Sequence, residues 1–324
     1  MPVGKMRIFV RALIGSATVI RRAEACQSRC IIARTMLAQQ LVNGLMLGGA
    51  YALVAIGYTL IFGVLNLLHL AHGEVFMVGA YVGLALALAG FSPWVTLGGA
   101  MLAAAVLGVI IERVAFRRVG DRGSHVTPLM TTIAVGLILQ HAVVKMFGAE
   151  PVAFPAPFAS AAFALGPLTL SSVQLLILAT SVALMGALEL FLRATPLGMT
   201  IRATAENPTV AGLLGVNVSL AIVATFAIAS ALAGAAGVLL AWNFTGLSPF
   251  FGVKVGLKGL AIMLLGGLGN VSGAMVGGLV VGVVEVLSVA YLASSYRDAF
   301  AFAVMIVILL VRPTGLLGAR LQTG

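Results

Sequence analysis

The stretch LVNGLMLGGAYALVAIGYTLIFGVLNL, residues 41–67, decides the class of this protein. It carries no charged side chain, and about 20 apolar helical residues are enough to cross the roughly 30 Å hydrocarbon core of a bilayer. Over all 324 residues, 61% are hydrophobic and only 9% are charged. Because a soluble domain averages about 25% charged residues, a water-soluble globular enzyme is close to excluded.

Further apolar runs follow residues 41–67 along the chain, and together they predict an all-α, polytopic transmembrane helix bundle of about 8–10 helices. The count is open because the first run could break near Gly57 or Gly63, and because residues 256–268 could form a partial or re-entrant segment. The further runs are 74–89, 93–112, 128–147, 171–192, 217–242, 256–268, 271–293 and 299–311.

The formal charge of +10 is unevenly distributed along the chain. Residues 1–35 hold seven of the 19 basic residues and one acid, which gives this N-terminal extension a charge of +6. The extension is a poor signal peptide. It is either an organellar presequence, or Met36 is the true initiator and residues 1–35 are an artefact of a start assigned too early. We expect a transmembrane domain over 36–318 and a short cytosolic tail over 319–324. On a chain this apolar, positive charge favours a membrane surface over nucleic acid as the partner.

Lysine and arginine in the loops predict the orientation, because cytosolic loops of membrane proteins carry an excess of both. Basic residues mark the loop 113–127, the loop 193–216 and the tail 312–324, which are separated by even numbers of crossings. Loop 148–170 contains no Lys or Arg and falls on the opposite side. The C-terminus is therefore expected in the cytosol. With nine crossings the basic extension would lie outside the cell, which contradicts the excess of Lys and Arg on the cytosolic side. Either one run contains two crossings, or the mature chain lacks the extension.

The sequence offers little for catalysis. It contains no G-x-x-x-x-G-K-[ST] phosphate loop, no H-E-x-x-H and no G-x-S-x-G, so we expect a chain that is not an enzyme and does not itself hydrolyse nucleotide. The two cysteines, Cys26 and Cys30, lack the further ligands that a metal site needs, and neither a metal nor a cofactor is expected. The glycine-rich segment 266–273 misses the dinucleotide fingerprint by one position and is interpreted as a tight turn between helices.

Small residues recur at intervals of four in several runs and predict close helix packing. These stripes are Gly44, Gly48 and Ala52; Ala227, Ala231 and Ala235; and Gly278 with Gly282. Glu285 lies within about 60° of Gly278 and Gly282 on a helix that turns by 100° per residue. It should therefore face protein or a transport path, not lipid.

The densest polar cluster is NLLHLAHGE over 66–74, which interrupts two apolar runs. It is either a simple loop between two helices or non-helical backbone that lines a cavity, as broken helices do in transporters. An ionisable residue at the centre of a membrane helix costs about 2.5 to 3.5 kcal/mol on insertion scales, so each needs a reason. Asn66, His72, Glu74 and Glu285 are therefore the candidates for a translocation pathway.

The loop 193–216 contains the signals of a short helix. Asn207 is a good N-cap, Pro208 suits the first helical position and Gly215 suits the position just past the end. These signals predict a helix over 208–214. Because a two-turn helix is not stable alone, it needs either the membrane or a cytosolic partner to rest on.

This loop resembles the coupling loop of ABC-importer permeases through its pattern A-E-N-x-x-x-A-x-x-x-G, from Ala205 to Gly215. The whole chain resembles the branched-chain amino acid permease family. The matching segments are 39–83, 195–217, 256–285 and the terminal RPTGLLG at 312–318. One departure is Leu68-His69-Leu70, where the family usually has an aromatic residue before Ala-His-Gly. The other is the extension, since members usually begin near Met36.

The resemblance implies a permease subunit that pairs with a second, similar permease, two cytosolic ATPases and an extracytoplasmic binding protein in a bacterial inner membrane. Its solute would be leucine, isoleucine, valine or a related small polar molecule such as an amide or urea. By the same resemblance, five residues of the loop would dock into an ATPase groove: Arg202, Glu206, Asn207, Ala211 and Gly215.

The alternative function is an ion-coupled secondary transporter or channel, with Glu285, His72 and Glu74 as relay groups. Paired broken helices in two related halves would be its evidence in the sequence, and the sequence does not show them clearly.

Overall fold

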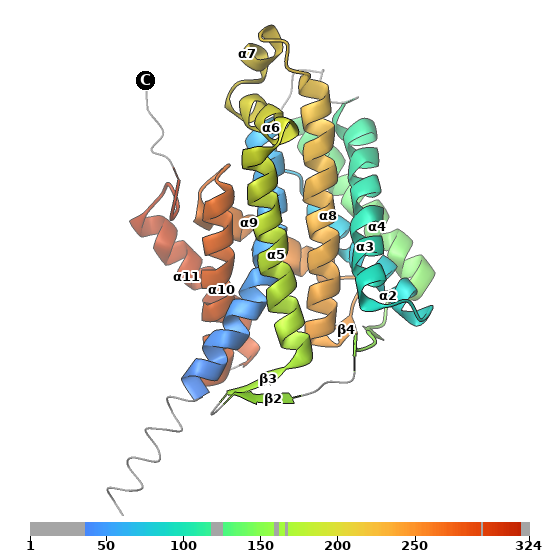
Figure 1. Cartoon of the computed structure of the whole chain (residues 1–324), viewed down its shortest axis with the longest axis vertical. Helices are drawn as coiled ribbons and strands as arrows, with labels where there is room; N and C mark the ends of the chain where they lie inside the picture. Colours follow the sequence, from blue (N-terminus) through green and yellow to red (C-terminus); the bar gives the residue numbers. More distant parts are fainter. Residues whose placement is uncertain (1–35, 118–125, 159–161, 166–167, 293, 319–324) are drawn as a thin grey trace, which may run out of the picture.

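The computed structural model describes residues 36–117, 126–158, 162–165, 168–292 and 294–318. These residues form a bundle of long helices that run between two ends (Figure 1). The short helices α6 (Pro196–Glu206) and α7 (Pro208–Leu213) lie at one end, called the α7 end below. The hairpin of β2 (Ala162–Leu165) and β3 (Leu168–Ser171) lies at the opposite, hairpin end.

Some of the predictions fall on parts of the chain outside the described residues. These parts are the basic extension 1–35, with Cys26 and Cys30, most of the loop between the third and fourth helices, and the tail 319–324.

Each of the apolar runs forms a helix, which confirms the predicted helical bundle. In the described part of the chain, the long helices are the first helix (Met36–Leu65), α2 (His72–Leu88), α3 (Pro93–Ile111), α4 (Val126–Phe147), α5 (Ser172–Ala194), α8 (Val218–Phe244), α9 (Phe251–Gly266), α10 (Val271–Tyr291) and α11 (Arg297–Val311). Six of them are long and apolar enough to cross a membrane. The first helix continues through Gly57 and Gly63 without a break.

Shorter elements complete the fold. Helix α3 continues into the π-helix η1 (Glu112–Phe116), and the 3-10 turn η3 (Ser294–Tyr296) precedes α11. The two-residue strands β1 (Val152–Ala153) and β4 (Gly246–Leu247) pair antiparallel. The expected turn at 266–273 is confirmed, since α9 ends at Gly266, α10 begins at Val271, and Gly267 has a φ of 109° that favours glycine.

Hydrogen bonds fix which end of the bundle the described part of the chain begins and finishes at. The side chain of Gln39, near the start of the first helix, donates to the carbonyl of Thr169 in the hairpin at 2.9 Å. The backbone N–H of Leu316, after α11, donates to the carbonyl of Leu265 at 2.8 Å, beside the α9–α10 turn at the other end. The described chain therefore begins at the hairpin end and finishes at the α7 end.

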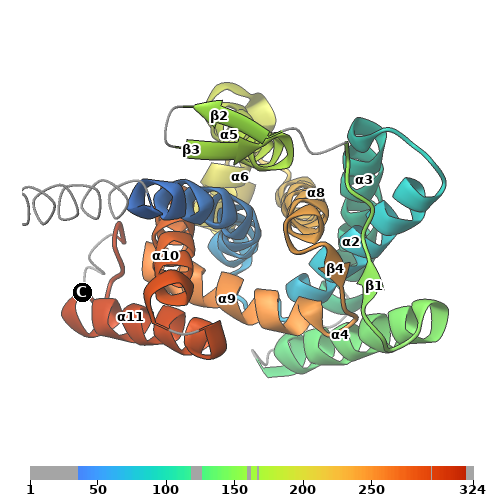
Figure 2. The ribbon, with the colours of Figure 1, turned by 90° about the horizontal axis from the view of Figure 1, so that it is seen from below.

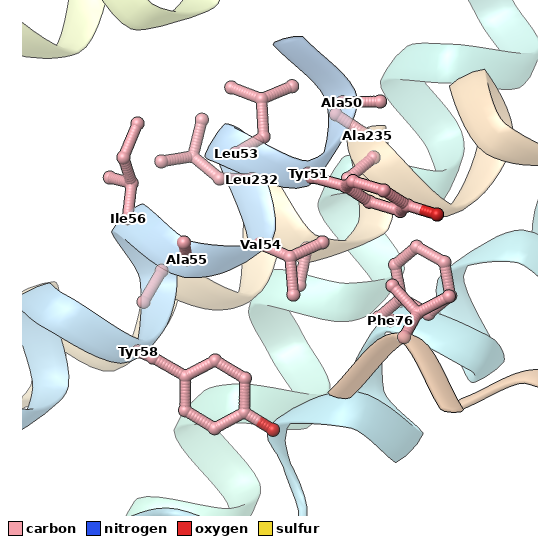
Figure 3. Packing of buried hydrophobic residues seen from close by; sticks show 14 of the residues in the cluster. Ala50, Tyr51, Leu53, Val54, Ala55, Ile56, Tyr58, Phe76, Leu232 and Ala235 are labelled. Atoms are coloured by element: carbon pink, nitrogen blue, oxygen red, sulfur yellow. The ribbon is translucent and has the colours of Figure 1, made fainter. Parts of the chain in front are cut away.

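The first helix lies at the centre of the bundle, beside α10 and α8 in Figure 2. Figure 3 shows its buried side chains, among them Tyr51 and Val54, near Phe76 of α2 and Leu232 of α8. The small-residue stripe that begins at Gly44 packs directly on the glycine stripe of α10. This contact is the close packing that both stripes predict.

Gly278→Ala should show how closely the first helix and α10 approach. A Cβ atom at Gly278 would lie 2.6 Å from Cα of Ala52, and such overpacking typically costs about 1–3 kcal/mol. Gly186→Ala is the control, because a Cβ there meets no atom within 4 Å and alanine stabilises a helix by up to about 1 kcal/mol over glycine. Thermal unfolding of both purified variants in one detergent measures the difference. Equal melting temperatures would contradict the packing.

Candidate functional site

Helix α7 forms at the place that the sequence predicts, with bounds that differ by one residue from 208–214. The side-chain oxygen of Asn207 accepts hydrogen bonds from the backbone N–H groups of Thr209 and Val210, both at 3.0 Å. These bonds satisfy two of the donors that a helix start leaves unpaired. Gly215 follows the helix with a φ of 84°, a conformation that glycine adopts without strain.

One face of α7 is apolar and exposed. Leu213 and Leu214 are 83% and 79% exposed, and Val210 is about half exposed. Ala211 is buried and anchors the other side of the helix. Helix α7 projects from the bundle (Figure 1), so the described residues leave its leucines without a covering surface. An apolar face of this kind on so short a helix needs either the membrane or a partner to cover it.

A cavity of about 720 Å³ opens beside α6, between that helix and the rest of the bundle. Its walls come from the last turns of the first helix, the end of α5, α6 and the α9–α10 turn. Two pairs of charged side chains line the cavity. Glu189 and Arg193 of α5 form a salt bridge of 2.5 Å, and Arg202 and Glu206 lie on α6.

The residues predicted for ATPase coupling therefore divide into two groups. Asn207, Ala211 and Gly215 build and anchor α7. Arg202 and Glu206 instead line the cavity beside α6. The two groups are neighbours in the sequence, but only the first group belongs to the helix whose apolar face is exposed.

The residues predicted for a translocation pathway do not lie together either. Asn66, with a φ of 52°, lines the same cavity as Arg202 and Glu206. His72 and Glu74 are buried in the first turn of α2, outside the residues that line this cavity.

The cluster 66–74 combines features of both alternatives that the sequence leaves open. Non-helical backbone joins the first helix to α2 over residues 66–71, and Asn66 at its start lines the cavity. His69 is buried, and its ring centroid lies 5.9 Å from that of His72. The ring of His72 in turn lies 4.7 Å from that of Tyr58. Most of the cluster is thus packed core, and its first residue belongs to the cavity wall.

Glu285 is fully buried, as its position on the glycine face of α10 predicts. Tyr51 of the first helix donates a hydrogen bond to its carboxylate at 3.0 Å, and Lys258 of α9 forms a salt bridge with it, also at 3.0 Å. Arg297 of α11 bonds the same carboxylate. Lys258 also pairs with Asp298 at 2.6 Å. Two positive and two negative charges therefore balance inside a cluster that joins four helices.

The partners of Glu285 are functional candidates that reasoning from the sequence missed. Lys258 could have indicated them, because a lysine within an apolar run needs a partner of opposite charge as much as a glutamate does. Arg297 and Asp298 stand just before the last apolar run, where a loop explained their charge equally well.

The comparison with protein families matches residues 40–309 to a family model described as branched-chain amino acid transport system / permease component. Among individual proteins, the chain is 38% identical over 294 residues to the high-affinity branched-chain amino acid transport system permease protein LivH of Salmonella typhimurium. That alignment covers 86% of this chain and 95% of the relative.

Two further relatives have similar coverage. The corresponding permease protein BraD of Pseudomonas aeruginosa is 37% identical, over 86% of this chain and 95% of its own. The probable branched-chain amino acid transport permease protein LivH of Methanocaldococcus jannaschii is 32% identical, over 82% and 88%. No solved structure matches the chain. With its membrane-crossing helices, this chain therefore belongs to the family of permease components of branched-chain amino acid transport systems.

Proposed function

We propose that the chain is the membrane-spanning permease subunit of an ATP-binding-cassette importer, and that it moves branched-chain amino acids or a related small polar solute across a bacterial inner membrane. Helix α7 is the observation on which the proposal rests, because a cytosolic ATPase would bind an exposed apolar helix face at one end of a membrane bundle. The names of the relatives support the solute class.

The energy would come from partner chains. The sequence has no phosphate loop, so two cytosolic ATPases would bind and hydrolyse ATP, while this chain has no enzymatic role of its own. A second, homologous permease would complete the membrane unit, and an extracytoplasmic binding protein would deliver the solute. Movement of the ATPases would reach the bundle through α7 and α6.

The α7 end would face the cytosol, together with the coupling segment 193–216 and the C-terminal tail 319–324. Arginine supports this orientation, because cytosolic flanks are rich in arginine. Arg113 lies in η1 after α3, Arg193 in the last turn of α5 and Arg312 directly after α11, and these three helices finish at the α7 end. The transmembrane domain would span 36–318, and the hairpin end would receive the binding protein.

Ion coupling through Glu285, His72 and Glu74 is the less favoured function. A relay group must exchange ions with water at each end of the membrane in turn, yet Glu285 is held by Lys258 and Arg297 in a balanced cluster. His72 and Glu74 do not line the cavity that opens to the α7 end. The family to which the chain belongs also fits the importer function.

Gly215→Pro tests the docking role of α7. Proline requires a φ near −65° and removes a backbone donor, whereas Gly215 has a φ of 84° and its N–H donates to the carbonyl of Gly212 at 3.1 Å. We expect the variant to insert into membranes but to capture no ATPase when purified. Gly90→Pro is the matched control, because Gly90 has a φ of 82° and lies between α2 and α3 at the hairpin end. Capture retained by Gly215→Pro would remove the docking role.

A further inference from the structure

We infer that the cavity beside α6 is a binding site for the zwitterionic head group of an α-amino acid, with Arg202 and Glu206 as the recognising pair. This inference rests on the proposed function and names the solute-recognising residues at the cytosolic end of the path. It also changes the role of these two residues, because the family resemblance would place them against an ATPase.

The size and depth of the cavity suit a small solute. Its volume of about 720 Å³ lies within the range of roughly 300–1,000 Å³ that small-molecule sites occupy. Thr59 and Leu60 line its inner end. They lie six and five residues before the end of the first helix at Leu65, so at a rise of 1.5 Å per residue the cavity reaches about 8–9 Å into the bundle.

The charges of the wall favour a ligand that carries both signs. Glu189 and Arg193 neutralise each other in a 2.5 Å salt bridge. Among the described residues, no salt bridge involves Arg202 or Glu206. These two are four positions apart on α6, which places them on one face with Cβ atoms about 6 Å apart. One amino acid head group could therefore pair with both residues. Its carboxylate would bind the guanidinium of Arg202, and its ammonium would bind the carboxylate of Glu206.

A ligand with a single charge would fit this wall less well. An anion would pair with Arg202 but would lie against the carboxylate of Glu206, and a cation would meet the reverse problem. Arg202 and Glu206 are exposed in the described chain, so the cost to a ligand with one charge is repulsion from the like-charged member of this pair, not burial. A zwitterion leaves neither side chain without a partner.

Apolar side chains provide the remainder of the lining. Leu60, Val64 and Leu192 are buried residues of the first helix and α5, and Ile201 adds a branched side chain from α6. They offer a surface for an aliphatic side chain, while Asn66 and Ser272 offer polar groups. The lining thus combines the two chemistries of a branched-chain amino acid.

A cysteine at position 272 can report occupation of the cavity. With Cys26 and Cys30 replaced by serine, the chain contains no other cysteine. Ser272→Cys changes one atom at the second residue of α10, in the cavity wall. Ser219→Cys is the matched control, because Ser219 is also a second helix residue, in α8, and lies outside the lining.

The experiment uses the permease pair assembled with its ATPases in detergent, a membrane-impermeant thiol reagent and leucine. At about ten times its dissociation constant, leucine should slow modification of the Ser272→Cys variant about tenfold, since the free fraction falls in that proportion. Modification of the Ser219→Cys variant should not change. 4-Methylpentanoate and 3-methylbutylamine, which each lack one of the two charges, should protect at least about tenfold more weakly.

Adding Arg202→Gln or Glu206→Gln to the Ser272→Cys variant should weaken protection by leucine about tenfold to a hundredfold, the usual loss for one charge-assisted hydrogen bond. Loss of ATPase capture by either variant would place that residue against the ATPase, as the family resemblance implies, and would overturn the inference. Equal protection by leucine and by either single-charge analogue would overturn the inference, and so would no protection by leucine.

ATP-driven leucine uptake by the wild-type assembly separates the two proposals. If uptake occurs but leucine does not protect position 272, only the cavity site is wrong. If no uptake occurs, the proposed function itself fails.

Discussion

Leu213→Asp should reduce ATP-driven uptake to the background level while the protein still inserts and folds. Leu213 is 83% exposed on α7, so the bundle itself loses nothing when this side chain becomes charged. In the proposed assembly the same side chain is buried in an apolar groove of the ATPase, where an unpaired carboxylate is costly. Central interface residues of this kind commonly carry more than about 2 kcal/mol of binding free energy, which corresponds to at least about a thirtyfold weaker complex.

Pro208→Asp provides the control for this change. It places the same charge on the same helix, at an exposed position about 120–160° away from Val210, Leu213 and Leu214 and therefore on the opposite face, and an acid in the first turn is favourable for a helix. Uptake and capture of the ATPase should both survive. If both aspartate variants lose uptake equally, added charge and not the apolar face is responsible. If Leu213→Asp retains uptake, α7 does not dock.

Glu285→Gln should destabilise the folded protein by about 3–5 kcal/mol, the usual cost of removing one partner from a buried ion pair. Glu285 is fully buried and receives bonds from Tyr51, Lys258 and Arg297. Glutamine at position 285 leaves the positive charges of Lys258 and Arg297 with one acidic neighbour, Asp298, whose side chain is 57% exposed. Thermal unfolding and the yield of monodisperse protein in detergent measure the effect.

Two further variants separate charge balance from the loss of one side chain. Glu189→Gln removes an acid from a partly exposed pair, where the cost should be about 0–1 kcal/mol. Glu285→Gln combined with Arg297→Gln leaves the Lys258–Asp298 pair intact and restores a neutral cluster, so it should recover part of the stability. If Glu285→Gln is no worse than Glu189→Gln, the buried cluster does not stabilise the bundle.

Local signals explain why some features were predictable from the sequence. The positions of α7 and its caps follow from Asn207, Pro208 and Gly215, whose conformational preferences act within one turn. The close packing of the first helix and of α10 follows from small residues spaced by four, because only small side chains let backbones approach so closely, although the spacing does not say which helices pair. In both cases the residue type and its spacing contain the physical reason.

The cavity and the ion cluster could not be found in the same way. Asn66 and Arg202 meet in one wall because the first helix and α6 finish at the same end of the bundle, and no spacing in the sequence expresses that. Lys258 and Glu285 lie on separate helices joined by a turn, so their pairing depends on how each helix is rotated. The sequence showed that Glu285 needed a partner, but not which residue it was.

The energy source of uptake tests the central claim most directly. Vesicles should contain this chain, a second permease and the ATPases, with the binding protein supplied on the hairpin side. We predict that leucine accumulates only with ATP on the α7 side, and that accumulation continues when proton and sodium gradients are dissipated. Uptake by this chain without the ATPases, driven by a proton or sodium gradient alone, would contradict the account.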